Sequence, residues 1–138
     1  MAETFELELA TPERLIMREP VSELELPTKN GYIGVLPGHA AMLAELATGH
    51  LNYVSQGRTH YMAVNAGFVE VLPDRVRVLA TTAERAGEID VKRAEEALRK
   101  AQERLSAGAN VGVDIARALS AMYRAQARIE VAQAAGRK

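Results

Sequence analysis

Four charged residues in the second half of the chain could hold a phosphate group. Asp90 and Arg93 are three residues apart, so a helix beginning at Asp90 would carry both on one face, beside backbone amides that favour an anion. Arg124 and Arg128 are one helical turn apart, and two guanidinium groups can bind phosphate oxygens in bidentate fashion. The alternative is a solvated helix face, on which Asp90 and Arg93 form an ion pair worth under about 1 kcal/mol.

Two helices must bring these charges together, and the hydrophobic spacing predicts the first of them directly after residue 88. Asp90 is its expected N-cap, while Ser106, Gly108 and Gly112 are expected to end it and to form a connection of about eight residues. A connection of this length suits an antiparallel helical hairpin, which would bring Arg124 and Arg128 toward the start of the first helix. The apolar stripe predicted for this helix consists of Val91, Ala94, Leu98, Ala101 and Leu105.

A second helix is predicted between Asp114, which can cap it, and Gly136. The segment is rich in alanine, which favours the helix but buries little apolar area. We therefore expect the hairpin to dock weakly and to be able to leave its docking surface while remaining helical, as a conformational switch requires. The apolar stripe predicted for this helix consists of Ile115, Leu119, Met122, Gln126 and Ile129.

The chain before residue 88 has the two-residue period of β-strands, for example where Phe5, Leu7 and Leu9 alternate with polar residues. Hairpin turns are predicted at Gln56-Gly57, between strands 51–55 and 58–64, and at Pro73-Asp74, between strands 67–72 and 75–79. The predicted fold class is therefore α+β in two parts. A β-sandwich of about eight to ten short strands over residues 1–87 precedes an antiparallel two-helix hairpin over residues 88–138.

Three glycines and a proline interrupt an apolar segment over residues 31–43. Gly31 and Gly34 flank a predicted two-residue tip, at which a strand stops, turns and restarts. Pro37-Gly38 is a turn pair, since proline presets φ and glycine can adopt a positive φ. On turn chemistry alone this segment is an ordinary cluster of β-turns, followed by His39.

Charge is distributed unevenly along the chain. Residues 1–89 carry 7 Lys and Arg against 12 Asp and Glu, a net charge of −5, whereas residues 90–138 carry 10 against 6, a net charge of +4. The basic second part suggests an acidic partner. We do not expect nucleic acid as the partner, because this part has one aromatic residue, Tyr123, and no basic run longer than two.

No apolar run approaches the roughly 20 residues that span a bilayer. The acidic N-terminus is unlike a targeting peptide, so membrane association is expected only through a complex.

Metal and catalytic sites are not predicted. The chain has no cysteine, and the spacings of His39, His50 and His60 match no metal-ligand motif. Glu88 and Asp90 are near one another, but no base, nucleophile or pocket accompanies them in the sequence. The glycines of segment 31–38 lack the Gly-Lys-Ser/Thr ending of a phosphate loop. We therefore expect no catalytic residues and no hydrolytic activity of the chain alone.

Segment 31–43 resembles the G-x-x-G-V-L-P-G-H-A-x-(L/M)-L motif of the ε subunit of the F-type ATP synthase. Residues 66–71 with 76–80 are similar to the last hairpin of that family, and residues 11–14 to its first turn. Residues 88–94 are similar to its helix start, including the (I/L)-D-x-x-R-A motif associated with ATP binding in some bacterial members. The resemblance covers nearly the whole chain and implies a β-sandwich followed by two helices.

The resemblance implies a non-catalytic subunit of the central stalk, located on the cytoplasmic face of the cell membrane as part of the ATP synthase complex. Its implied partners are the gamma subunit, the ring of c subunits and the alpha/beta subunits of the catalytic head, where the extended helices would oppose ATP hydrolysis. The segment with Lys29, Asn30, Gly31 and Tyr32 corresponds to the c-ring contact. The stretch near the gamma subunit contains His39, Met42 and Leu43.

The resemblance also implies ATP as a regulatory ligand, with no obligatory cofactor and no essential magnesium. It assigns the acidic residue beside the adenine to Glu84. Two other kinds of protein remain as alternatives: a freestanding ATP-sensing module without synthase partners, and a β-sandwich enzyme, which the missing catalytic residues disfavour. The residues implied for ATP binding are Glu84, Ile89, Asp90, Arg93, Arg124 and Arg128.

Overall fold

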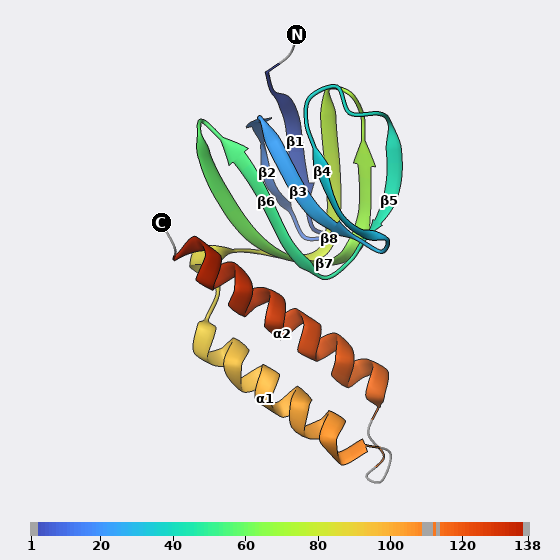
Figure 1. The fold of residues 1–138 in the computed structure, drawn as a ribbon, viewed down its shortest axis with the longest axis vertical. Helices are drawn as coiled ribbons and strands as arrows, with labels where there is room; N and C mark the ends of the chain where they lie inside the picture. Colours follow the sequence, from blue (N-terminus) through green and yellow to red (C-terminus); the bar gives the residue numbers. More distant parts are fainter. Residues whose placement is uncertain (1–2, 109–111, 113, 137–138) are drawn as a thin grey trace.

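A computed structural model describes residues 3–108, 112 and 114–136. Eight β-strands form one part of the molecule, and a short 3-10 helix, η1 (Ala86–Glu88), leads from them to α1 (Val91–Ala107) and α2 (Ile115–Ala135) (Figure 1). The predicted fold class, a sandwich followed by a helical hairpin, is confirmed. The strands are β1 (Phe5–Ala10), β2 (Leu15–Val21), β3 (Glu23–Thr28), β4 (Gly31–Val35), β5 (Met42–Leu46), β6 (Gly49–Ser55), β7 (Arg58–Val71) and β8 (Arg75–Arg85).

The strands follow the order β2-β1-β8-β7-β5-β3-β4, and β6 pairs with both β3 and β7. Only the β1–β8 pairing is parallel among the pairings of the described strands. The sheet therefore folds over on itself into two layers that enclose the core. Strands β2 and β4 lie at its two edges.

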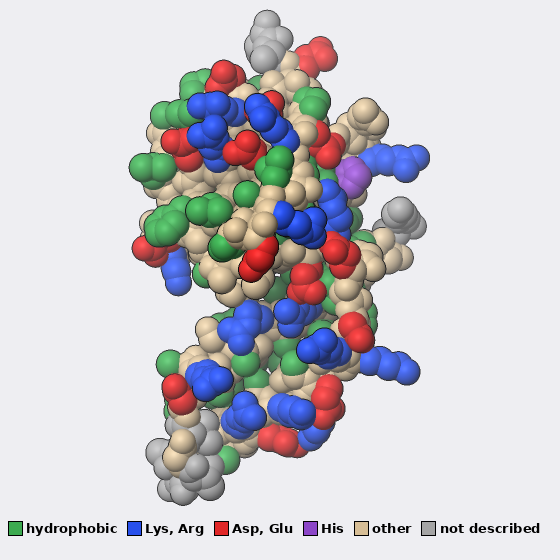
Figure 2. Space-filling model, turned by 180° about the vertical axis from the view of Figure 1, so that it is seen from behind, with side chains coloured by type: hydrophobic (Ala, Val, Ile, Leu, Met, Phe, Trp, Pro, Cys, Tyr) green, Lys and Arg blue, Asp and Glu red, His purple; other side chains and the backbone are tan. Residues whose placement is uncertain are grey.

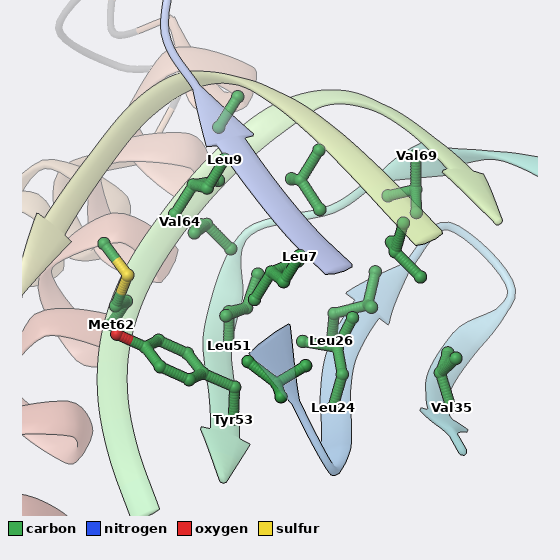
Figure 3. Close-up of a cluster of buried hydrophobic side chains, with 14 of the residues drawn as sticks. Leu7, Leu9, Leu24, Leu26, Val35, Leu51, Tyr53, Met62, Val64 and Val69 are labelled. Atoms are coloured by element: carbon green, nitrogen blue, oxygen red, sulfur yellow. The ribbon is translucent and has the colours of Figure 1, made fainter. Parts of the chain in front are cut away.

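Alternate side chains of the strands fill the space between the layers (Figure 3). Leu7, Leu9, Leu24 and Leu26 are completely buried, whereas the residues between them, such as Glu25, point outward. Each fully buried side chain of this size contributes about 1.5–3 kcal/mol relative to an exposed one. The two-residue period of the sequence thus corresponds directly to the inner and outer faces of the sandwich.

Three of the predicted turns are confirmed. Gln56 and Gly57 both have a positive φ, 51° and 76°, as a two-residue hairpin turn requires. At Pro37-Gly38 the amide of His39 donates to the carbonyl of Leu36 over 3.2 Å, and Gly38 has a φ of 84°. The chain also reverses at Pro73-Asp74, where β7 passes into β8.

The predicted tip between Gly31 and Gly34 is wrong, because both residues lie within strand β4. The chain turns earlier, at Lys29 and Asn30. Thr28 closes this turn: its hydroxyl donates to the carbonyl of Gly31 over 2.7 Å and accepts from the amide of Asn30 over 3.2 Å. The register with β3 continues along the whole of β4, which ends at Val35.

The two strands predicted before and after residue 66 form one long bent strand, β7. Ala66 and Gly67 have positive φ values of 55° and 128°, and the irregular backbone there lets the strand change partners. Residues before the bend pair with β6, and residues after it pair with β5. A side chain at Gly67 would have its Cβ 1.9 Å from the carbonyl oxygen of Leu79, so only glycine fits this position.

Both predicted helix caps are confirmed. The carboxylate of Asp90 accepts from the amide of Arg93, and that of Asp114 from the amide of Arg117, each over 3.1 Å. Helix α1 ends at Ala107, and Gly108 follows with a φ of 64°. Of the predicted connection, residues 109–111 and 113 lie outside the described residues. The proposed domain boundary between residues 87 and 88 stays a prediction.

Helix α2 lies between α1 and the sandwich, where it packs against β6 and β7 (Figure 1). Four residues of the apolar stripe predicted for α2 are half-buried and Ile115 is 40% exposed, so the fully buried positions of the helix are other residues. Helix α2 is in contact with α1 on one side and with β6 and β7 on the other. Small buried side chains on α2 let the backbones of these neighbours come close to it. The buried residues of α2 are Ala118, Ala125, Ala127 and Val131, and those of α1 are Ala94 and Ala101.

Candidate functional site

Four of the six residues implied for ATP binding line one hollow at the junction of the two parts of the molecule. The hollow has a volume of about 240 Å³ and lies where β8, η1, α1 and α2 meet. Within it Nε of Arg128 is 2.5 Å from Oε1 of Glu84, so an ion pair joins α2 to the end of β8. The predicted residues in the lining are Glu84, Asp90, Arg93 and Arg128, accompanied by Glu88 and Ala94.

The end of β8 holds Glu84 in place through its neighbour Arg85. The guanidinium of Arg85 donates to the hydroxyl of Tyr53 over 3.1 Å, and its backbone amide donates to the carboxylate of Glu88 over 3.0 Å. Tyr53 is 1% exposed and its ring stacks on His60 at 4.8 Å, so this anchor is rigid. Sequence reasoning missed these supporting residues, because a contact between β6 and β8 leaves no local pattern.

Asp90 and Arg93 contact each other differently from the predicted surface ion pair. The carboxylate of Asp90 caps α1 through the amide of Arg93. Among the ion pairs of the described residues, none joins the two side chains. The guanidinium of Arg93 therefore lines the hollow without being held by Asp90.

Arg124 and Ile89 do not line this hollow. Arg124 lines a second cavity, between α2 and the sandwich, which has room for about one water molecule, roughly 10 Å³. Its lining also includes Glu84 and Arg128, so the two hollows lie side by side and share the ion pair. Ile89 is half-buried directly after η1, and its amide donates to the carbonyl of Ala86.

The hollow therefore offers two guanidinium groups, one of them already neutralised. A phosphate-bearing ligand would have to compete with Glu84 for Arg128, while Arg93 is available at the N-terminal turn of α1. The arrangement can bind an anion, but it holds no nucleophile with an adjacent base. In the described residues, no group of three or more His, Cys, Asp and Glu is arranged to hold a metal ion.

The segment implied to contact the c ring forms the exposed turn between β3 and β4. Lys29, Asn30 and Gly31 are exposed, and Tyr32 is 47% exposed. The ring of Tyr32 stacks on His50 at 4.3 Å, and its hydroxyl accepts from the amide of His50 over 3.1 Å. Burial raises the pKa of Tyr32 above its ordinary value. The turn is thus exposed at its tip and rigid at its base.

Of the residues implied to lie near the gamma subunit, Leu43 is 79% exposed, while His39 and Met42 are half-buried. His39 is bonded within its own segment, with Nδ1 2.8 Å from the carbonyl of Ala40. Two other exposed side chains line a shallow hollow of about 290 Å³ with Leu43: Phe68, 62% exposed, and Leu79, 51% exposed. We call Leu43, Phe68 and Leu79 the apolar patch.

Hydrophobic side chains gather on the side of the sandwich where β5 lies (Figure 2). Phe68 and Leu79 are direct partners across β7 and β8, and their neighbours Val69 and Val78 point into the core. Sequence reasoning missed Phe68 and Leu79 as surface residues. The signal was present, since both are large apolar residues at the outward positions of alternating strands.

None of the described helices is long and apolar enough to cross a membrane.

Comparison with known proteins identifies the family. Residues 4–86 match the beta-sandwich domain of the ATP synthase delta/epsilon chain, and residues 88–133 match its long alpha-helix domain. The chain is 51% identical over 132 residues to the ATP synthase epsilon chain of Solibacter usitatus, covering 96% of this chain and 98% of that protein. It is 44% identical over 131 residues to the epsilon chain of Nitratidesulfovibrio vulgaris, covering 95% and 97%.

Solved structures agree. A chain in the mitochondrial ATP synthase of Euglena gracilis, determined with OSCP, F1 and the c-ring, aligns with a TM-score of 0.83 at 25% identity, covering 96% of this chain and 83% of that one. A chain in the central stalk and c-ring of the Tetrahymena thermophila mitochondrial ATP synthase has the same fold, with a TM-score of 0.56 at 14% identity over 95% of each chain. The resemblance to ε subunits is confirmed, and the chain belongs to the delta/epsilon chain family of ATP synthase subunits.

Proposed function

We propose that the chain is a non-catalytic central-stalk subunit of the proton-transporting ATP synthase, in which the sandwich joins the gamma subunit to the c ring. The apolar patch carries this proposal. Leu43, Phe68 and Leu79 are large, more than half exposed and adjacent on the outer face of the sheet. An exposed cluster of this kind marks a protein interface rather than a solvent-facing surface. The gamma subunit is the partner to which we assign it.

We assign the c-ring contact to the turn at Lys29–Tyr32. Its tip is exposed, while the stacking of Tyr32 on His50 holds its base. A rigid turn of this kind can transmit torque, because it keeps its shape when a neighbouring subunit pushes against it. Binding to the complex places the chain at the cytoplasmic face of the cell membrane, without a membrane contact of its own.

Regulation by the helical hairpin is the second part of the proposal. Its buried residues are alanines and one valine, so its docking buries little apolar area per residue. The Glu84–Arg128 pair that joins it to β8 has both side chains about one-third exposed, which limits its contribution to under about 1 kcal/mol. A hairpin held this weakly can leave the sandwich. Its basic helices can then reach acidic loops of the alpha/beta subunits and oppose ATP hydrolysis.

ATP would stabilise the docked hairpin as a regulatory ligand. Its phosphates would bind Arg93 and Arg128, with Arg124 one turn away, and Glu84 would then be free to accept a hydrogen bond from the base. Because the hollow is formed by β8, α1 and α2 together, a bound ligand would hold all three in place. No obligatory cofactor and no magnesium are needed for this role.

Co-purification with the gamma subunit tests the proposal. We expect Phe68→Asp to reduce recovery of the gamma subunit at least about tenfold, since an unpaired carboxylate would be buried at the interface. Leu15→Asp is the matched control, because Leu15 is 52% exposed but lies outside the apolar patch. Recovery of the wild-type chain alone, without gamma or alpha/beta subunits, would instead support a freestanding ATP-sensing module.

Two measurements test regulation separately. Truncation after Glu88 is expected to raise ATP hydrolysis by the assembled enzyme, and an unchanged rate would contradict inhibition by the hairpin. Calorimetric titration with ATP is expected to give binding to the wild type and weaker binding to the double variant Arg124→Ala/Arg128→Ala. Equal affinities would exclude the proposed site.

A further inference from the structure

The two edge strands of the sheet differ in their chemistry. Strand β2 contains Arg18, Glu19 and Pro20, and charged residues and proline are the usual means by which an edge strand avoids pairing with another chain. Strand β4, at the other edge, has neither a charged residue nor a proline over residues 31–35. In the described part of the chain, β4 pairs with β3 alone. One edge of the sheet is thus protected and the other is open to an added strand.

Next to the open edge, strands β3, β4 and β6 form a hollow of about 280 Å³ on the outer face of the sandwich. Glu25 lies opposite Gly34 of β4 on one side and opposite Asn52 of β6 on the other. Glu23 also lines the hollow, so both charged residues of its lining are carboxylates, and part of the wall is the exposed Leu36. The lining suits a cationic group with an apolar stem.

Two details of this hollow point to a donor from outside the chain. Oδ1 of Asn52 is buried and has no hydrogen-bond partner among the described residues. A buried acceptor left in this state keeps its desolvation penalty uncompensated, which a bound donor would offset. Above Gly34 there is open space where a side chain would otherwise stand. The space connects the free edge of β4 with the carboxylate of Glu25. Oε1 of this carboxylate is 2.7 Å from Nε2 of His50, so among the contacts of the described residues Oε2 is the oxygen left for an incoming cation.

We propose that the free edge of β4 and this hollow form a docking groove for an extended segment of a partner polypeptide that carries an arginine or lysine. The segment adds to β4 through main-chain hydrogen bonds, and its cationic side chain passes above Gly34 to Glu25. Neighbouring strands are about 4.8 Å apart, so an arginine on the added strand and Glu25 on β3 are two spacings apart, which their side chains together can span. The groove is separate from the apolar patch and from the nucleotide hollow. It uses the end of β4 that contains Gly34, beyond Gly31 and Tyr32, which we assign to the c-ring contact, and it goes beyond the function proposed above.

A peptide titration tests the charge recognition. The probe is acetyl-Thr-Arg-Thr-amide, and the control peptide has citrulline, which has nearly the same shape without the charge, in place of arginine. Amide resonances of the full chain are followed by NMR. We expect the arginine peptide to shift residues 23–25, 34 and 52 and to bind at least about tenfold more tightly than the citrulline peptide. Equal affinity of the two peptides would overturn the proposal, as would binding of spermidine to these residues without binding of the arginine peptide.

Two variants link the binding to the groove. Gly34→Val is expected to fold normally, since its Cβ meets nothing within 4 Å and valine favours strands, but to lose about tenfold in affinity for the arginine peptide by closing the path. Glu23→Gln is expected to weaken binding severalfold, while the matched variant Glu13→Gln, at another exposed glutamate, is expected to leave it unchanged. Undiminished binding by a Gly34→Val chain that melts like the wild type would overturn the proposal.

The assembled synthase tests whether a partner occupies the groove. Carbodiimide labelling of carboxylates, measured by mass spectrometry, is expected to modify Glu23 and Glu25 in the free chain and to be reduced at least about fivefold in the complex. Glu13 serves as the internal reference. Equal labelling of Glu23 and Glu25 in the two samples, with the gamma subunit present in the complex, would overturn the docking groove while leaving the central-stalk assignment in place.

Discussion

The sandwich and the helical hairpin are stabilised by different kinds of packing. The buried side chains of the sandwich are mainly leucine and valine, together with Tyr53, and they come from all eight strands. The buried side chains of the hairpin are five alanines and Val131. Alanine has a high helix propensity but little apolar area to bury. We therefore expect the hairpin to remain helical when it leaves its docking surface, whereas the strands of the sandwich depend on one another.

The junction between the sandwich and the helical hairpin is packed differently from either part. At one end of α2 the contact with the sandwich is polar and includes the Glu84–Arg128 ion pair, a cavity of water size and the hollow beside it. Polar, partly solvated contacts form and break with small changes in free energy. The comparison contrasts a sandwich with a large apolar core with a hairpin that is held by small side chains and polar contacts, and it can be tested by substitutions placed in each part.

The largest difference is expected for leucine-to-alanine substitutions in the two parts. Leu24→Ala, at a completely buried position of β3, is expected to reduce the free energy of unfolding by about 2–5 kcal/mol. Leu98→Ala, at a half-buried position of α1, is expected to cost much less, because water already reaches the side chain. Urea denaturation of both variants measures the difference. Equal losses would contradict the contrast between the two parts.

A larger side chain at a buried position of the hairpin is expected to undock the hairpin without destabilising the sandwich. Ala125 is 1% exposed in α2, and Ala125→Leu inserts a larger side chain where there is no room, at a cost of about 1–3 kcal/mol. We expect the hairpin to undock while the thermal unfolding of the sandwich is retained, which hydrogen exchange of the α2 amides would detect. Ala116→Leu, at an exposed position of the same helix, is the control and is expected to leave docking unchanged.

Loss of a helix cap is expected to have a smaller effect. Asp114→Ala removes the carboxylate that accepts from the amide of Arg117 and should destabilise α2 by about 1 kcal/mol. Asp114→Asn keeps an acceptor at the same place and should restore most of the loss. Circular dichroism during thermal unfolding compares the two variants. If the two variants lost the same stability, the hydrogen bond from the amide of Arg117 would contribute nothing to α2.

The smallest effect is expected for Tyr32 at high pH. Burial raises its pKa, so the folded chain binds the phenolic proton more tightly than the unfolded chain does. The free energy of unfolding is then expected to fall as the pH rises from the ordinary tyrosine value, about 10, toward the raised value in the folded chain. Tyr32→Phe should flatten the pH dependence in this range. An unchanged slope in the variant would assign the effect to other groups.

Much of the fold could be predicted from local patterns. The alternation in β1, the turn pairs Pro37-Gly38 and Gln56-Gly57, and the caps at Asp90 and Asp114 all lie where they were expected. These features depend on φ preferences and on short-range hydrogen bonds, which neighbouring residues decide.

The errors arose where a distant segment decided the outcome. Strand β7 is continuous because β6 and β5 pair with its two halves, although Ala66-Gly67 locally resembles a break. The buried face of α2 is set by its two neighbours and not by its largest apolar residues. The same limit applies to the candidate site, where the anchor of Arg85 on Tyr53 joins residues 32 positions apart.

By itself, the amino-acid sequence determined the order of the elements, the change from a two-residue to a helical period near residue 88, and the family, since motifs and periodicity are properties of neighbouring residues. The tertiary structure alone decided that Glu84 meets Arg128, that Leu43, Phe68 and Leu79 form one exposed patch, and that β4 keeps an open edge beside Glu25. These relations depend on strand register and on the docking of α2, which contacts between distant segments establish only when the whole chain has folded.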